Sequence, residues 1–451
     1  MKKKIFALAL LCFGGSIAFS QTQLIGNTVV NFDNGTASTE SLPIGNPQDV
    51  IDNHPGITDI TEAQRYVYNG EKPRFSQNIQ RDVNGSLLFF IIDGSVYNKD
   101  GIMLGTGKYI QEITSYLPPY DDFTELSYTD LPEGSTETII LPLKTRCNSY
   151  RIIASRYNGH FVEDIGIQKD IDPYFNHEIL SYIIDFNEDH DDYLNGVKGK
   201  ILSTGSNGLY DNFDLLGSAD NNSCYSSHIS AINTGVNNQY MVAVSKCDGT
   251  STYKVNGDGT YQELSWADGP TQGDFEYLIF GNNHERSELE IVKMGTKYRM
   301  ASVMMVSPNL PTSGTDYKAK VVIRDFNSNG VFDYFSNNNL TTLVLEPQIN
   351  NVAQNFHITG IEFSQSGNKL WVLTEDAPYL WNIDLTNLPV NHSFGNDGVQ
   401  DVYQLTPANN LVGSAAAGHL ETMNDGRIYF YKVQNGLGSQ TISKIDNPED
   451  V

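Results

Sequence analysis

The sequence predicts an all-β protein built from short, tightly turned strands, and three observations lead to this fold class. Short runs of β-branched and aromatic residues alternate with turn residues throughout the chain. Hydrophobic residues make up 39% and aromatic residues 11% of a chain with 39 glycines, a composition that suits a strand-and-turn protein with a large core. No run with the period and end caps of a helix exceeds roughly ten residues.

The clearest example of this pattern is the stretch 358–388, which contains three strands in succession. A Ser-Gly-Asn turn at residues 366–368 precedes the β-forming run KLWVLT, and Ala-Pro at residues 377–378 precedes a third strand at residues 379–385. Such a meander pairs its strands but cannot bury both of its faces. It must therefore stack on further copies of itself.

The same combination of a turn and a following strand occurs six times in the sequence. Each copy has Gly, Asn or Ser residues in the turn, and apolar and aromatic residues then alternate with others. A second shared feature is an outer strand that ends in an acidic residue, as at Asp185, Asp325, Asp384 and Asp446. The turns lie at residues 84–85, 147–149, 237–238, 295–296, 366–368 and 424–426.

Small repeated sheets that stack form either an open solenoid or a closed β-propeller. The strand at residues 24–32 favours the propeller, because a strand from one terminus can complete the last sheet and remove an exposed edge. The longest step between turns, from Asn148 to Asn237, leaves room for a degenerate extra copy at residues 199–216. We therefore predict one closed propeller over residues 21–451, with seven blades (six as the alternative) and an N-terminal strand that completes the last blade.

Residues 1–20 predict a signal peptide, because three lysines precede an apolar run and small residues stand at Ala18 and Ser20. The run is too short for a membrane-spanning helix, and no later segment is apolar enough to cross a bilayer. The mature chain keeps three cysteines, too few for a disulfide framework that holds the fold. Cys224 and Cys247 can pair if neighbouring strands bring their Cβ atoms together.

The net charge of the chain is −25, from 54 acidic and 29 basic residues. This charge repels phosphate backbones and anionic lipid surfaces, so nucleic acid is excluded as a partner and no membrane insertion is expected. The acidity itself is typical of a solvated surface with some capacity for cations.

The chain resembles the WD40-like or YVTN-like propeller heads of secreted and surface proteins from gliding and related Bacteroidota. The resemblance rests on residues 84–104, 360–372 (GIEFSQSGNKLWV), 380–386 (LWNIDLT) and 419–450, and it covers most of residues 24–450. Members of that family usually continue into further modules and a sorting domain read by the type IX secretion system. No sorting domain is visible before Val451. The resemblance implies a secreted protein, extracellular or at the cell surface, or one of the periplasm or outer membrane if no sorting domain exists.

One loop matches the front of a calcium-binding loop, D-x-N-x-N-G-x-x-D, in which side-chain oxygens converge because Gly330 permits a sharp turn. Ser336 stands where an EF-hand has its bidentate glutamate, and the same residue types also form ordinary hairpin turns. A second acidic stretch, residues 185–192, fits either a cation site or a solvated loop. The candidate Ca²⁺ ligands are Asp325, Asn327, Asn329 and Asp333.

No motif of a catalytic class is present, whether nucleophile elbow, zinc-protease helix, phosphate-binding loop or dinucleotide fingerprint. We therefore predict a non-enzymatic recognition or docking module whose partner is an envelope or surface protein or an extracellular glycan. The alternative is an exported propeller enzyme that acts on polysaccharide, as a hydrolase or a lyase, through carboxylates that meet in space. Trp371 and Trp381 fit either packing between blades or platforms for sugar rings.

Overall fold

The computed structural model describes most of the chain between residues 23 and 450. The signal peptide predicted for residues 1–20 lies outside this part. The described residues are 23–25, 28–33, 36–53, 56–71, 77–82, 84–106, 137–145, 147–158, 176–189, 198–202, 214–215, 225–236, 238–246, 249–268, 289–306, 318–331, 340–349, 352–353, 358–374, 379–386, 401–405, 411–414, 420–422, 426–433 and 440–450.

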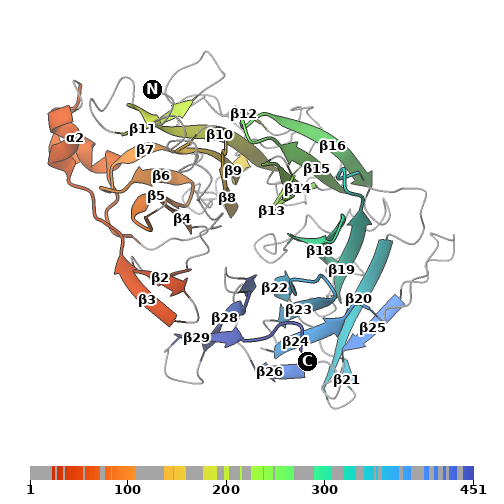
Figure 1. The fold of residues 1–451 in the computed structure, drawn as a ribbon. Helices are drawn as coiled ribbons and strands as arrows, with labels where there is room; N and C mark the ends of the chain where they lie inside the picture. The colour runs from red at the N-terminus through yellow and green to blue at the C-terminus, as the bar shows by residue number, and fades with distance from the viewer. Residues whose placement is uncertain are drawn as a thin grey trace, which may run out of the picture.

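The fold is all-β, as predicted, and its small antiparallel sheets follow one another around a common centre (Figure 1). The first sheet contains β1 (Gln23–Ile25), β2 (Thr28–Asp33) and β3 (Thr36–Ser41). The second contains β4 (Gln77–Arg81), β5 (Leu87–Ile92), β6 (Ser95–Asn98) and β7 (Met103–Thr106). Between them lie the short helices α2 (Pro47–Asn53), α3 (Ile60–Ala63) and η1 (Gln64–Tyr66).

The next two meanders are joined in strand pairing at one position, His177 opposite Tyr225. One contains β8 (Glu137–Pro142), β9 (Ser149–Asn158) and β10 (Asn176–Asp189), and both β11 (Lys198–Leu202) and β12 (Asp214–Leu215) pair with β10. The other contains β13 (Tyr225–Asn233), β14 (Tyr240–Lys246), β15 (Gly249–Val255) and β16 (Tyr261–Asp268).

Three further sheets complete the succession. One contains β17 (Leu289–Met294), β18 (Lys297–Val306), β19 (Lys318–Phe326), β20 (Leu340–Ile349) and β21 (Val352–Ala353), and β25 (Asp401–Leu405) pairs in parallel with β20. The next contains β22 (Ile358–Phe363), β23 (Lys369–Thr374), β24 (Tyr379–Asp384) and β26 (Leu411–Ser414). The last contains β27 (Leu420–Thr422), β28 (Ile428–Val433) and β29 (Gln440–Ile445).

All six turns found in the sequence join the first strand of a sheet to its second strand. Each contains a residue with φ between 57° and 81°, a region that glycine and asparagine adopt at the lowest cost. This requirement explains why the turns were visible in the sequence. The left-handed residues are Gly85, Asn148, Asn238, Gly295, Gly367 and Gly426.

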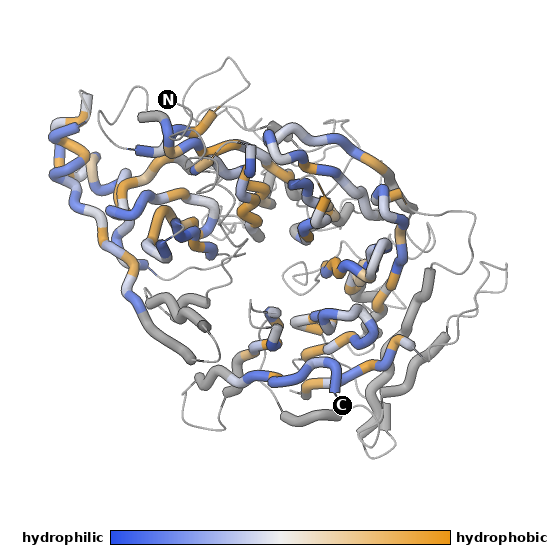
Figure 2. The backbone as a smooth tube through the Cα atoms, in the orientation of Figure 1, coloured by the Kyte–Doolittle hydropathy of each residue, from blue (hydrophilic) through white to orange (hydrophobic). Residues whose placement is uncertain are grey.

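The hydrophobic core lies between consecutive sheets, because the strands are apolar on both faces. In β5, Phe90 packs with Tyr68 and Ile79, while Phe89 packs with Tyr150 of the following sheet. Further clusters join each later sheet to the next. Figure 2 shows the hydrophobic residues concentrated on the strands.

The first strands of the sheets contact one another in the order β1, β4, β8, β13, β17, β22 and β27.

The N-terminal strand does not complete the last blade, contrary to the prediction. Within the described residues, β1 and β2 pair with each other and with β3, and β27–β29 form a separate sheet. The register places Ile25 opposite Thr28 and Asp33 opposite Thr36, so Gly-Asn and Asn-Gly dipeptides connect the strands. Such dipeptides favour tight hairpins, which build a sheet from the N-terminal residues alone.

The extra copy predicted at residues 199–216 is also absent from the described part of the chain. The strands found there, β11 and β12, both pair with β10 and extend an existing sheet. The long step between Asn148 and Asn237 contains β10 itself, which has 14 residues. The sheet formed by β1–β3 was not among the six copies found in the sequence.

Buried tyrosines make the fold sensitive to alkali. Burial raises the pKa of Tyr150 and of Tyr240 to about 12, and it also raises the pKa of Tyr182. In the unfolded chain a tyrosine ionises at about pH 10, so the folded state holds more protons above that pH and the free energy of unfolding falls. In a tyrosinate absorbance titration we expect one group of tyrosines to ionise only near pH 12, as the protein unfolds. Complete ionisation near pH 10 with the fold intact would contradict this.

Candidate functional site

The turns between first and second strands gather on one face of the molecule, where hydrogen bonds connect them to neighbouring sheets. Thr145 Oγ1 donates to the carbonyl of Gly257 (2.7 Å), and Lys293 Nζ donates to the carbonyl of Thr234 (2.5 Å). Arg299 Nη1 donates to the carbonyl of Gly367 (2.9 Å). We call this surface the turn face. It comprises the turns at residues 82–86, 143–149, 234–239, 295–296, 364–368 and 426–427, and those after third strands at residues 98–102, 256–260, 327–331 and 447–450.

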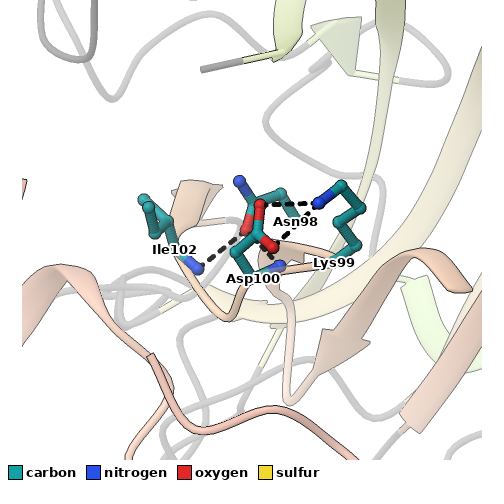
Figure 3. Close-up of polar contacts among 4 residues, drawn as sticks. All are labelled: Asn98, Lys99, Asp100 and Ile102. Atoms are coloured by element: carbon teal, nitrogen blue, oxygen red, sulfur yellow. Dashed lines mark hydrogen bonds and ion pairs between the residues drawn. The ribbon is translucent and has the colours of Figure 1, made fainter. Parts of the chain in front are cut away.

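A five-residue turn with a glycine in fourth place recurs on the turn face. Figure 3 shows the example after β6, in which Asn98 Oδ1 accepts from the backbone N–H groups of Asp100 and Ile102, both at 2.9 Å. Gly101 N donates to the carbonyl of Asn98 (3.0 Å), and its φ of 76° requires glycine. Lys99 forms an ion pair with Asp100 at 2.9 Å.

The predicted calcium loop contains the same turn. Asn327 Oδ1 accepts from the N–H groups of Asn329 (2.9 Å) and Val331 (3.2 Å), and Gly330 N donates to the carbonyl of Asn327 (2.9 Å). These contacts reproduce those of the turn at Asn98. Hairpin geometry alone therefore accounts for Asn327 and Gly330.

In the turns after β6 and β19, the fourth-place glycine packs against a neighbouring segment of the chain. A Cβ on Gly330 would lie 2.4 Å from Met241 Cε, and a Cβ on Gly101 would lie 2.6 Å from the backbone of the segment before α2. A hydrogen bond accompanies each contact: Thr252 Oγ1 donates to the carbonyl of Gly330 (2.8 Å), and Tyr68 N donates to that of Gly101 (2.8 Å). The turn after β19 thus fastens its sheet to the preceding sheet, and the turn after β6 fastens its sheet to the segment before α2.

Asp325, the first of the predicted calcium ligands, is held by an arginine. Arg299 Nε donates to Asp325 Oδ1 (2.7 Å), and Arg299 Nη2 donates to Oδ2 (2.9 Å). Asp333 lies outside the described residues. Among the described residues no group of three or more His, Cys, Asp or Glu side chains is arranged to hold a metal ion. The structure therefore places Asp325 near the end of β19 and Asn327 and Asn329 in the turn that follows, but it does not test the calcium assignment.

Calorimetry of chelator-treated protein tests the calcium assignment, which stays a prediction. Coordination through Asp325 requires this carboxylate to exchange its arginine for the cation, so Arg299→Ala should bind calcium more tightly than the wild type. Asp333→Asn should weaken binding in both backgrounds. Absence of any binding heat in wild type and Arg299→Ala would contradict the assignment.

The second acidic stretch begins at a buried carboxylate. Asp185 is 3% exposed, and its Oδ1 accepts from the backbone N–H (2.9 Å) and the side-chain amide (2.8 Å) of Asn187. Residues 190–192 lie outside the described chain. The described portion, residues 185–189, is the end of β10, where the pairing with β11 shifts register between Asp185 and Asp189.

Both tryptophans of the stretch 358–388 belong to the core. This agrees with one of the two predicted alternatives, packing between blades. Trp371 and Trp381 are fully buried, which excludes them as exposed platforms for sugar rings. Trp371 Nε1 donates to the carbonyl of Pro448 (3.2 Å), so it also anchors the C-terminal segment. Beside it, Glu449 accepts from the backbone N–H and the hydroxyl of Ser366, both at 2.7 Å. No sequence signal indicated this contact, because it joins distant segments.

Cys147 is disulfide-bonded, and the other cysteines lie outside the described residues. The predicted partners Cys224 and Cys247 adjoin Tyr225 and Lys246, which are paired across β13 and β14. The mature chain has only these two cysteines besides Cys147, so within one chain a disulfide at Cys147 and a Cys224–Cys247 bond exclude each other. Peptide mapping without reduction decides between them.

No protein-family model and no curated protein matches the chain. Among solved structures, hydrazine synthase of Kuenenia stuttgartiensis is similar with 11% identity and a TM-score of 0.41, over 93% of this chain and 90% of that one. The β-propeller domain of Cps50 (Swd1) from Myceliophteria thermophila is 9% identical, with a TM-score of 0.34 over 93% and 95% of the two chains. At such TM-scores these likenesses carry no argument, and the fold rests on this chain's own strand pairing and core.

The described residues include no helix that is both long and apolar enough to cross a membrane.

Proposed function

We propose that the chain is a closed, seven-bladed propeller that serves as a non-enzymatic recognition or docking module, with the turn face as its binding surface. The order of contacts among the first strands, which runs from β1 to β27, supports this blade number. Closure requires the sheet of β1–β3 to meet the sheet of β27–β29. The partner is an envelope or surface protein or an extracellular glycan.

The observation that carries this proposal is the interlocking of the turns. Arg299 reaches from β18 to the turn at Gly367, and Thr145 reaches from one sheet to the turn at Gly257 of the next. Turns tied in this way lose little further conformational entropy when a partner binds, and a rigid loop surface on a scaffold is a usual place for recognition.

Export is the second part of the proposal. It is supported by the signal-peptide pattern of residues 1–20 and by the resemblance to surface propellers of Bacteroidota. N-terminal sequencing of the protein recovered from its host should begin at Gln21. A mature protein that begins at Met1 would contradict export by this route.

A capture experiment tests the function. Mature protein, residues 21–451, is immobilised and exposed to envelope and secreted fractions of its host, with and without calcium. Gln365, on the turn face, and Gln262, on the outer strand β16, are both exposed and allow a matched pair of substitutions. Capture of a defined partner should be lost in Gln365→Trp and kept in Gln262→Trp.

Two outcomes would overturn the proposal. Equal capture by both variants would place the binding surface elsewhere than the turn face. Turnover of a polysaccharide by the mature protein, measured as release of reducing ends, would favour the exported enzyme that is the alternative.

A further inference from the structure

Asparagine followed by glycine occurs at four places where the structure describes both residues. Such a pair deamidates more readily than asparagine before any other residue, because glycine has no side chain to hinder attack of its backbone nitrogen on the asparagine amide. In a folded protein the pair must open locally before it reacts, so its contacts control the rate. The four pairs are Asn69-Gly70, Asn84-Gly85, Asn256-Gly257 and Asn329-Gly330.

Two of these pairs are held by neighbouring sheets. The carbonyl of Gly257 accepts a hydrogen bond from Thr145 Oγ1 (2.7 Å), and the carbonyl of Gly330 accepts one from Thr252 Oγ1 (2.8 Å). Gly330 also packs against the side chain of Met241. Opening of either pair therefore requires a contact between two sheets to break.

The pair Asn69-Gly70 is held in a different way. Asn69 Oδ1 accepts a hydrogen bond from the backbone N–H of Glu71 (2.9 Å), so the side chain that would react is already engaged. A Cβ on Gly70 would lie 3.2 Å from Ile44 Cδ1. The glycine is therefore covered by the segment before α2.

The pair Asn84-Gly85 has neither kind of restraint. Asn84 is exposed, and in the described part of the chain its side-chain amide forms no hydrogen bond. No atom lies within 4 Å of the position that a Cβ on Gly85 would take. Gly85 N donates to the carbonyl of Asp82 (3.0 Å), and Arg81 Nη1 donates to the carbonyl of Gly85 (2.9 Å), so these bonds stay within one hairpin. The turn can open without breaking a hydrogen bond to another sheet.

We propose that Asn84-Gly85 is a site of spontaneous deamidation on the turn face. The backbone nitrogen of Gly85 attacks Asn84 Cγ, the Cγ–Nδ2 bond breaks, and ammonia leaves with the proton of the attacking nitrogen. Water then opens the resulting succinimide ring at one of its two carbonyl carbons, which gives aspartate or isoaspartate. The reaction consumes only water and needs no oxidant or cofactor.

Both products change the turn face chemically. Each adds a carboxylate near Asp82, whose Oδ1 accepts from the backbone N–H groups of Asn84 (2.8 Å) and Ser86 (2.9 Å). Isoaspartate also inserts a methylene group into the backbone between these two donors, so the two bonds cannot both keep their present geometry. The protein thus acquires an aged form of the turn face, whether or not that face is the recognition surface.

Peptide mapping by mass spectrometry of the mature protein, incubated in mildly alkaline buffer, tests the proposal because the four pairs lie in different tryptic peptides. Deamidation at Asn84 should be roughly tenfold faster than at Asn256 or Asn329 in the folded protein. In urea the four pairs should react at similar rates, because the contacts that distinguish them are lost. Asn84→Ser should abolish the isoaspartate signal of this turn.

A second variant tests whether contacts between sheets give the protection. Thr252→Val removes the hydroxyl that holds the carbonyl of Gly330, so it should speed deamidation at Asn329 about threefold and leave the rate at Asn84 unchanged. Circular dichroism and thermal unfolding confirm that the variant is folded. Equal rates at Asn84 and Asn256 in the folded wild type, or no reaction at Asn84 in conditions that convert Asn329, would overturn the proposal.

Discussion

Gly101→Ala should destabilise the protein by about 4 kcal/mol, the sum of backbone strain and a clash between sheets. Gly101 has a φ of 76°, and a Cβ there would lie 2.6 Å from both Gly45 N and Pro43 O. These are backbone atoms, which cannot rotate away as a side chain would. The carbonyl of Gly101 also accepts from Tyr68 N (2.8 Å), so a shift of the turn would break that bond. Denaturant unfolding followed by circular dichroism measures the loss.

The matched control for this variant is Gly85→Ala. Gly85 has nearly the same φ, 81°, but no atom lies within 4 Å of the position that its Cβ would take. It should therefore show only the cost of a left-handed backbone, about 1–2 kcal/mol. Equal losses in the two variants would mean that the turn after β6 does not fasten its sheet to the preceding segment.

Trp371→Ala should cost about 4 kcal/mol of stability and release the C-terminal segment. Trp371 is fully buried among Leu373, Leu420 and Ile428, and its indole N–H donates to the carbonyl of Pro448. Removal of the side chain leaves a cavity between two sheets and an unpaired carbonyl. We expect residues 447–450 to become sensitive to proteases and to exchange amide hydrogens faster.

Leu373→Ala separates the two effects, because Leu373 is equally buried in the same cluster. It should lower stability by a comparable amount, about 3 kcal/mol, and leave the C-terminal segment protected. Exposure of that segment in both variants would show that general loosening of the core, and not the tryptophan hydrogen bond, governs its position.

The sequence revealed those features of the fold that depend on local chemistry. Left-handed turn residues such as Gly295 and Gly367 must be glycine or asparagine, so the turns that begin second strands were found in all of the sheets except that of β1–β3. Strand β3, TASTES, was missed because it has no large apolar residue and therefore no hydrophobic pattern. The parallel pairing of β25 with β20 was missed because it joins segments that are far apart in the chain.

The candidate site was harder to predict than the strands, because its residues acquire their roles from neighbours distant in sequence. The residues Asp325 to Gly330 match both a calcium loop and a hairpin turn. Only the structure shows that Arg299 of the same sheet holds Asp325 and that Thr252 joins the loop to the preceding sheet.

Hydrogen–deuterium exchange of the mature protein, alone and bound to its captured partner, tests the central claim that the turn face is the recognition surface. The account predicts slower exchange in the turns at residues 234–239, 295–297 and 364–368 when the partner is bound, and unchanged exchange in the outer strand β16. Protection confined to outer strands, with the turns unchanged, would contradict it.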